Sequence, residues 1–216
     1  MVLGAIEFQE RLAGVVAALD RVSAGVRIVC VTKTHPVEDL RVVLDAGCVD
    51  LGENYLGELE EKSRLLGVEY APRWHFLGHL QRNKIARIAA LCAEIHSVSR
   101  SEEIASLARR GFAGRIYLQV AAPGGGESRS GADAAEIPGL VEHARSLSVD
   151  VAGLMAMALP GSDAEVASYF RSVAQLADRL GLAEKSMGMS GDFLIAAAEG
   201  ATVVRLGTVL LGQRSL

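Results

Sequence analysis

Val29-Cys30-Val31-Thr32-Lys33-Thr34-His35-Pro36 is the stretch of sequence that decides the fold. Ile28 to Val31 is a continuous apolar and mostly β-branched run, which is typical of a strand buried on both faces of a parallel sheet. Pro36 stops the strand and can open a helix at its first turn. The stretch therefore predicts a buried strand that delivers Lys33 into the loop before a helix.

Lys33 has two interpretations at this position. Most lysines are exposed, so one interpretation is a solvated loop charge. In the other, partial desolvation makes its amine a nucleophile, for example in a Schiff base. The residues that follow the other predicted strands bear on this choice.

Seven further strand-sized runs follow the first, and a helical pattern separates each pair. The predicted strands after Ile28–Val31 are residues 48–51, 74–77, 94–98, 116–120, 151–155, 185–189 and 203–206. Residues 5–20 form an amphipathic helix before the first strand. Alternating strands and helices predict a parallel sheet, and eight repeats favour a closed (β/α)8 TIM barrel. We expect residues 1–216 to form a single domain of this kind with an extra N-terminal helix; an open doubly wound sheet is the alternative.

Composition excludes several classes of partner. The net charge is −4, and no basic run is present, which argues against nucleic acid. No apolar segment approaches the roughly 20 residues that a membrane span needs. Three cysteines without C-x-x-C spacing predict free thiols in a reducing cytoplasm. The glycine-rich segment within residues 122–131 is predicted to be a mobile loop.

Polar residues gather after the predicted strands rather than before them. In a barrel such positions share the C-terminal rim, where active sites are built. Residues 187–191 and 205–208 follow the seventh and eighth strands, and their small residues, hydroxyls and amides suit an anion. The alternative is ordinary turn glycines and helix-capping hydroxyls. A reactive lysine and a phosphate site on one rim together point to a phosphorylated aldehyde, above all pyridoxal 5′-phosphate (PLP). The residues after strands are Lys33, Glu53, Asn54, Gly78, His79, Ser190, Gly207 and Thr208.

Six segments carry a resemblance to a known family. They are VTKTHP, GENYLGE, WHFLGHLQRNK, GLMAMA, SMGMS and VRLGT, in this order and spacing. The chain resembles the pyridoxal phosphate homeostasis proteins over nearly its whole length. These are barrels similar to the N-terminal domain of alanine racemase.

The resemblance implies a role for each matching residue. Lys33 is expected to hold PLP as a Schiff base, and Arg205 to face the pyridine nitrogen. The phosphate is expected at Ser190, Gly207 and Thr208, and the rest of the site at Asn54, His75 and Met189. The chain departs from the family after the fifth strand, where Gln119-Val120-Ala121-Ala122 precedes glycines, and at Gly191, where members tend to carry an acid.

Other polar residues are given ordinary interpretations. His75 and His79 lie on a strand and its following turn and do not share a face, so no metal site is expected. Glu58, Glu60 and Glu61 are interpreted as solvated helix charges.

Two functions remain open. A carrier would buffer PLP within the cell and pass it to PLP-dependent apoenzymes, without significant turnover of amino acids. An amino-acid racemase or a related enzyme is the alternative, but racemisation on this fold needs a second base, which alanine racemase takes from a separate C-terminal domain. The chain shows no such domain, so we expect a carrier. We also expect the protein to be a cytoplasmic monomer.

Overall fold

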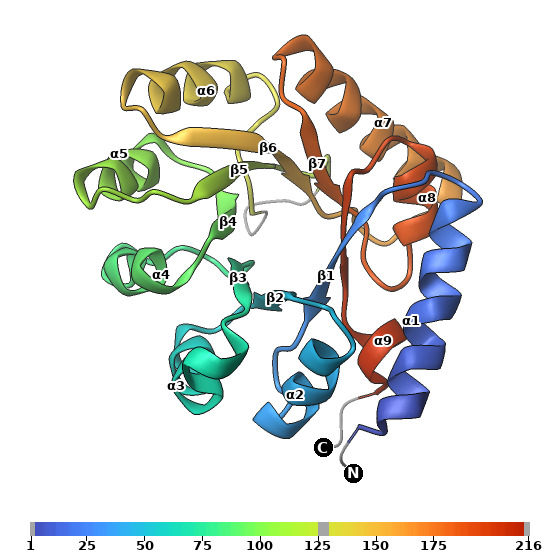
Figure 1. The fold of residues 1–216 in the computed structure, drawn as a ribbon. Coiled ribbons are helices and arrows are strands. Elements are labelled where there is room, and N and C mark those ends of the chain that lie inside the picture. The colour runs from blue at the N-terminus through green and yellow to red at the C-terminus, as the bar shows by residue number, and fades with distance from the viewer. Residues whose placement is uncertain (1–2, 125–129, 214–216) are drawn as a thin grey trace.

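The computed structural model describes residues 3–124 and 130–213 and shows a closed barrel of eight parallel strands (Figure 1). Each strand pairs with the next one along the chain, and the last strand pairs with the first. The strands are β1 (Arg27–Val31), β2 (Asp50–Glu53), β3 (Arg73–Phe76), β4 (Glu94–Val98), β5 (Arg115–Val120), β6 (Asp150–Ala156), β7 (Glu184–Met187) and β8 (Val203–Leu206). The predicted TIM barrel is confirmed, and the open sheet is excluded.

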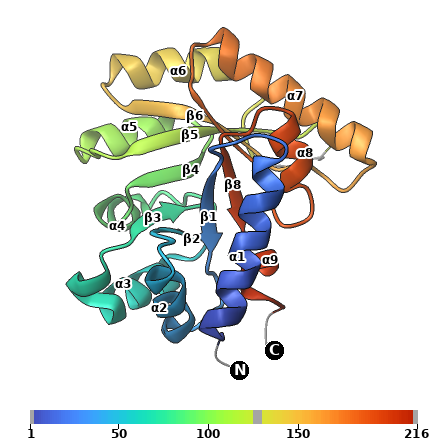
Figure 2. The same ribbon diagram turned by 45° about the vertical axis from the view of Figure 1, so that its right-hand side comes forward.

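Helices surround the barrel (Figure 1). The first of them, α1, precedes the barrel as predicted and packs against α2, α8 and α9, so that the two ends of the described chain lie side by side (Figure 2). The helices are α1 (Ala5–Asp20), α2 (Val37–Asp45), α3 (Leu56–Tyr70), α4 (Ile85–Leu91), α5 (Ser101–Arg109), α6 (Ile137–Ser146), α7 (Asp163–Arg179), α8 (Phe193–Ala198) and α9 (Thr208–Leu211). In the part of the chain that the structure describes, no helix has the length and apolar character to cross a membrane.

Strands β2 and β7 differ most from their predicted bounds. β2 begins at Asp50, two residues after the predicted start, and Val49 is 46% exposed. β7 ends at Met187, because Gly188 leaves the extended conformation with a φ of 92°. The prediction included apolar residues at one end of each strand that do not pair with a neighbouring strand in the barrel.

The apolar core lies between the strands and the surrounding helices. Outward-facing strand residues such as Leu51, Ile95 and Leu206 pack there against helix residues such as Leu40 and Phe170. The barrel interior is different, because residues of non-adjacent strands meet inside it through hydrogen bonds. Branched aliphatic side chains usually fill this space. Here a polar interior connects the two ends of the barrel.

The glycine-rich segment is tied together at its flanks. Ala121 and Ala132 are joined by a backbone hydrogen bond of 2.9 Å, and the Gln119 amide donates to the Ser130 hydroxyl at 2.8 Å. Residues 125–129, on which the prediction of a mobile loop rests, lie outside the described residues.

Candidate functional site

A cavity of about 300 Å³ opens at the C-terminal rim of the barrel. It brings together seven of the eight residues that the sequence assigned to a cofactor site: Lys33, Asn54, Met189, Ser190, Arg205, Gly207 and Thr208. They follow or end strands β1, β2, β7 and β8. Parallel closure of the barrel is what places these distant segments around one space.

Lys33 lies half-buried just past the end of β1. Thr34 beside it has a φ of 66°, a conformation that residues other than glycine rarely adopt. The loop then enters α2 behind Pro36, as the sequence predicted. The lysine is therefore presented to the cavity by a short loop of unusual geometry.

The loops after β7 and β8 lie next to each other. The Ser190 hydroxyl accepts the backbone N–H of Val209 at 3.2 Å. The backbone N–H groups of Ser190, Gly191, Gly207 and Thr208 find no acceptor among the described residues. All four residues line the cavity. Unpaired amides grouped in this way bind anions such as phosphate.

Arg205 lies at the base of the cavity and is only 3% exposed. Its guanidinium donates to the carbonyl oxygens of Ser186 at 2.5 Å and Ala156 at 2.8 Å. Burial lowers its pKa to about 10, so the group is still protonated at pH 7. It has no carboxylate hydrogen-bond partner within the described ranges. A buried cation held only by neutral acceptors favours an acceptor atom on a ligand.

The loop after β3, which contains Gly78, lies very close to the loop after β2, which contains Asn54. A Cβ atom at Gly78 would collide with the backbone carbonyl of Asn54. Ser97 also donates to the Gly78 carbonyl at 2.5 Å. Glycine is required here by close backbone approach rather than by its own conformation.

His75 is the predicted site residue that the structure does not bring to the cavity. It is fully buried inside the barrel, where its Nε2 lies 2.7 Å from Asp50 Oδ1 and its Nδ1 lies 2.9 Å from His96 Nε2. His96 Nδ1 lies 2.9 Å from the Ser186 hydroxyl, which accepts from Arg205 at 2.8 Å. A continuous hydrogen-bonded relay thus links His75 to the cavity.

The relay ends in a cluster of charges at the N-terminal face of the barrel. Glu94 accepts from Arg27 and Tyr117 at 2.9 and 3.0 Å, and also from Arg115. Although burial opposes its ionisation, hydrogen bonds from His75, His96 and Arg27 hold the pKa of Glu94 far below its usual range.

His75, Glu94 and His96 approach the geometry of a metal-binding group, since their ligand atoms lie within 4.8 Å of one another. The sequence pattern revealed neither Glu94 nor His96 as a neighbour of His75. Three guanidinium groups and three carboxylates already balance in this cluster, and the two histidines are joined by hydrogen bonds. We therefore assign the three residues to the hydrogen-bonded relay.

His35 is a cavity residue that sequence reasoning missed. Its Nδ1 lies 3.2 Å from the carboxylate of Asp39, one helical turn further on, and that carboxylate also accepts the Leu3 N–H at 2.8 Å. The four-residue spacing to Asp39 is the sequence signal that indicates this pairing.

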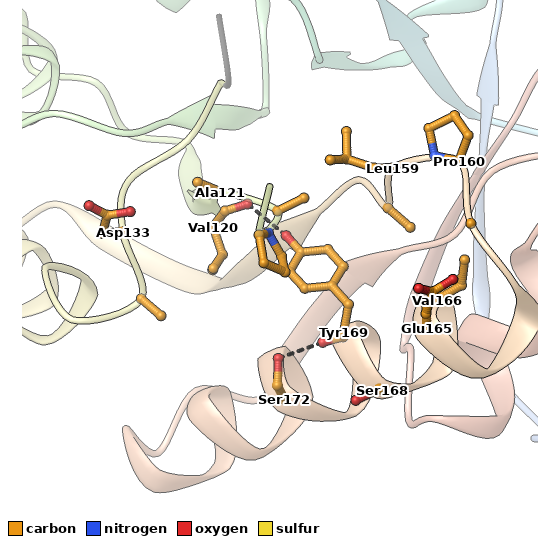
Figure 3. A pocket seen from close by; sticks show the side chains of 15 residues that line it. Val120, Ala121, Asp133, Leu159, Pro160, Glu165, Val166, Ser168, Tyr169 and Ser172 are labelled. Carbon is orange, nitrogen blue, oxygen red and sulfur yellow. Dashed lines mark hydrogen bonds between the residues drawn. The ribbon is translucent and has the colours of Figure 1, made fainter. Parts of the chain in front are cut away.

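Two other cavities lie at the rim. One of about 690 Å³ is formed by α7 and the loops after β5 and β6, and the Tyr169 hydroxyl in it donates to the Val120 carbonyl at 2.8 Å (Figure 3). Its acidic side chains, Asp133 and Glu165, make it a poor anion site. The other, of about 1110 Å³, adjoins the Lys33 cavity through Asn54, Leu77 and Met157.

Comparison with known proteins identifies the family. The alanine racemase N-terminal domain family matches residues 10–215. A pyridoxal phosphate homeostasis protein of Deinococcus radiodurans is 38% identical over 200 residues, which cover 90% of this chain and 92% of the relative. The chain belongs to the pyridoxal phosphate homeostasis protein family. The family member of Pseudomonas aeruginosa is also 38% identical, over 91% of this chain and 88% of its own.

Solved structures of other proteins show the same barrel. PipY of Synechococcus elongatus with PLP bound is 31% identical, with a TM-score of 0.85 over 95% of this chain and all of its own. Alanine racemase of Corynebacterium glutamicum is 18% identical and has a TM-score of 0.72 over 99% of this chain and 62% of its own. This second likeness concerns the fold alone.

Proposed function

We propose that this chain binds PLP at the Lys33 cavity and takes part in PLP homeostasis as a carrier of the cofactor. The observation that carries the proposal is the placement of Lys33 in one cavity with four unpaired amides of the β7 and β8 loops. A cavity of about 300 Å³ suits a compact ligand. The PLP-bound relative PipY, which shares the barrel at 31% identity, supports the choice of ligand.

Each cavity residue has a defined part in this proposal. The Lys33 amine would hold the cofactor through its aldehyde group, with loss of water. Ser190, Gly207 and Thr208 bind the phosphate through amides and hydroxyls. Arg205 would donate a hydrogen bond to the pyridine nitrogen, and Asn54 and Met189 line the cavity. PLP, when bound, supplies a reactive aldehyde on an electron-accepting ring.

The arrangement of the tyrosines supports a carrier over a racemase. Tyr117 is fully buried in the interior cluster, and the Tyr169 hydroxyl is occupied by Val120. No tyrosine is among the described residues that line the Lys33 cavity. His35 does line this cavity, and its imidazole is a candidate second base for the racemase alternative.

The test is an absorbance spectrum of the purified protein before and after borohydride, followed by mass spectrometry of the lysine peptides. We expect a yellow protein whose reduction fixes the cofactor to Lys33. Fixation at Lys62, Lys84 or Lys185 with Lys33 free would contradict the assignment. Incubation with L- and D-alanine should leave their chirality unchanged. Racemisation at about 1–10³ per second would favour the enzyme.

We further propose that residues 1–216 act as one domain, as a monomer in the cytoplasm, and that PLP-dependent apoenzymes receive the cofactor. The free and buried thiols of Cys30 and Cys92 support a reducing compartment. Light scattering of the purified protein tests the monomer. Reactivation of a PLP-dependent apoenzyme by the loaded carrier, faster than by the same concentration of free PLP, tests the transfer.

A further inference from the structure

Lys62 is a buried lysine that the proposed function does not use. It lies on α3, is 6% exposed, and donates from Nζ to three oxygens: the Thr32 carbonyl at 2.8 Å, Glu53 Oε1 at 2.7 Å and Glu58 Oε2 at 2.7 Å. An ammonium group has three donors, and all three are occupied. These three contacts engage the Lys62 amine, so it is not available to compete with Lys33 for an aldehyde.

The groups that contact Lys62 either belong to the loop that carries Lys33 or form hydrogen bonds with it. The Thr32 hydroxyl donates to Glu53 Oε1 at 2.6 Å, and the Thr34 backbone N–H donates to Glu58 Oε2 at 2.7 Å. The residues immediately before and after Lys33 are therefore both fixed by this group of side chains. The interpretation of Glu58 as a merely solvated helix charge is wrong for this reason.

The conformation of the loop explains why such contacts are needed. Thr34 has a φ of 66°, which a β-branched residue adopts only when its surroundings impose it. The hydrogen bond from its N–H to Glu58 supplies that constraint. The fully buried Glu53 holds Thr32 from the other side.

A purely stabilising role would not require charges here. Replacing a buried ion pair by apolar groups of similar volume is often neutral or stabilising. Glu53 also leaves its Oε2 atom without a hydrogen-bond partner in the described part of the chain, which is costly at a site with no exposure. Burial raises the pKa of Glu53, against the opposing effect of the Lys62 ammonium.

We propose that Glu53, Glu58 and Lys62, here called the brace, are positioning residues that set the place of the Lys33 amine. This inference rests on the proposed function, since it concerns the capture of the PLP aldehyde by Lys33. The brace holds the backbone of Thr32 and Thr34 and does not touch the phosphate loops. Its loss should therefore impair the lysine and leave the phosphate site intact.

The experiment compares Lys62→Met with Lys185→Met as a matched control, because Lys185 is a partly buried lysine that pairs with Asp178 of α7 and has no ion pair with the Lys33 loop among the described residues. Cofactor-free protein is mixed with PLP, and separately with pyridoxal, and Schiff-base formation is followed by absorbance. We expect Lys62→Met to slow capture of both compounds about tenfold or more, the effect of losing one buried charged hydrogen bond. Lys185→Met should match the unmodified protein.

A second pair of variants avoids dependence on a fully buried substitution. Glu58→Gln keeps an acceptor for the Thr34 N–H, whereas Glu58→Ala removes it. We expect Glu58→Ala to slow capture and Glu58→Gln to restore most of the rate, with circular dichroism confirming that both fold. Capture by Glu58→Ala at the rate of the unmodified protein would overturn the brace, whatever Lys62→Met does.

The two proposals fail differently. If the unmodified protein forms no Schiff base at Lys33, the proposed function is wrong. If it forms one and the brace variants form it equally fast, the proposed function stands and the brace is refuted. A loss confined to PLP, with pyridoxal unaffected, would also refute the brace, because it would place the defect at the phosphate.

Discussion

Ser186 tests whether the hydrogen-bonded relay inside the barrel is real. Its hydroxyl, fully buried, accepts from Arg205 at 2.8 Å and lies 2.9 Å from His96 Nδ1. Ser186→Ala removes this oxygen and leaves both nitrogens short of a partner. Arg205 keeps its two carbonyl acceptors, while His96 loses its contact at Nδ1.

The expected loss follows from these contacts. A buried polar group left without its partner costs about 1–3 kcal/mol, and here two groups are affected. We therefore expect Ser186→Ala to lower the free energy of unfolding by about 2–6 kcal/mol. For a chain of this size, that corresponds to a fall in Tm of roughly 4–24 °C.

The assay is urea unfolding of the cofactor-free protein followed by circular dichroism, so that bound ligand does not add to the stability. Ser172→Ala is the matched control, because among the described residues its hydroxyl donates to the Tyr169 carbonyl of the preceding helical turn and makes no other hydrogen bond. We expect the control to change the unfolding free energy by about 0.5 kcal/mol or less. Equal losses in the two variants would refute the relay.

Three further predictions concern the cavity, a loop contact and acid. Replacing Ser190 and Thr208 together by Ala should weaken binding of PLP by about 2–3 kcal/mol and binding of pyridoxal far less, measured by equilibrium titration; equal losses would count against the phosphate site. Gly78→Ala should lower Tm and cofactor retention through collision with a neighbouring carbonyl, whereas Gly139→Ala, with open space around it, should not. Folding lowers the pKa of Glu94, so the unfolded chain takes up protons first and stability should fall as pH drops below about 4, most steeply in the unmodified protein and less in Glu94→Gln.

Much of the fold could be predicted from the sequence, because each strand has a recognisable local pattern of residues. β4 and β8 match their predicted bounds, since both are short segments between clear helical patterns. The position of Lys33 followed from β1 and Pro36 alone. Strand ends were less accessible, because register is set by neighbouring strands, as in the exposure of Val49.

The polar interior was not accessible in the same way. His75 and His96 are 21 residues apart, and His96 and Ser186 are 90 apart. Only closure of the barrel makes them neighbours. The brace was hidden for a different reason: Glu58 and Lys62 have the four-residue spacing of an ordinary surface pair on a helix. The loop that contains Thr32 buries this pair, and no local sequence pattern indicates that burial.

The placement of charge inside the barrel bears on why such a site would carry PLP and not use it. The interior carboxylates Asp50 and Glu94 are paired at the N-terminal face, while burial lowers the pKa of His96 to about 3 and keeps it neutral. The hydrogen-bond acceptors of Arg205 at the base of the cavity are therefore all neutral in the described part of the chain. Under the proposed function its fixed charge would disfavour a second cation on the pyridine nitrogen of bound PLP. A ring without that cation accepts electrons weakly, so Lys33 can hold and release the cofactor with little side chemistry. A carboxylate brought beside the ring would have the opposite effect, and the relay keeps the carboxylates at the far end of the barrel.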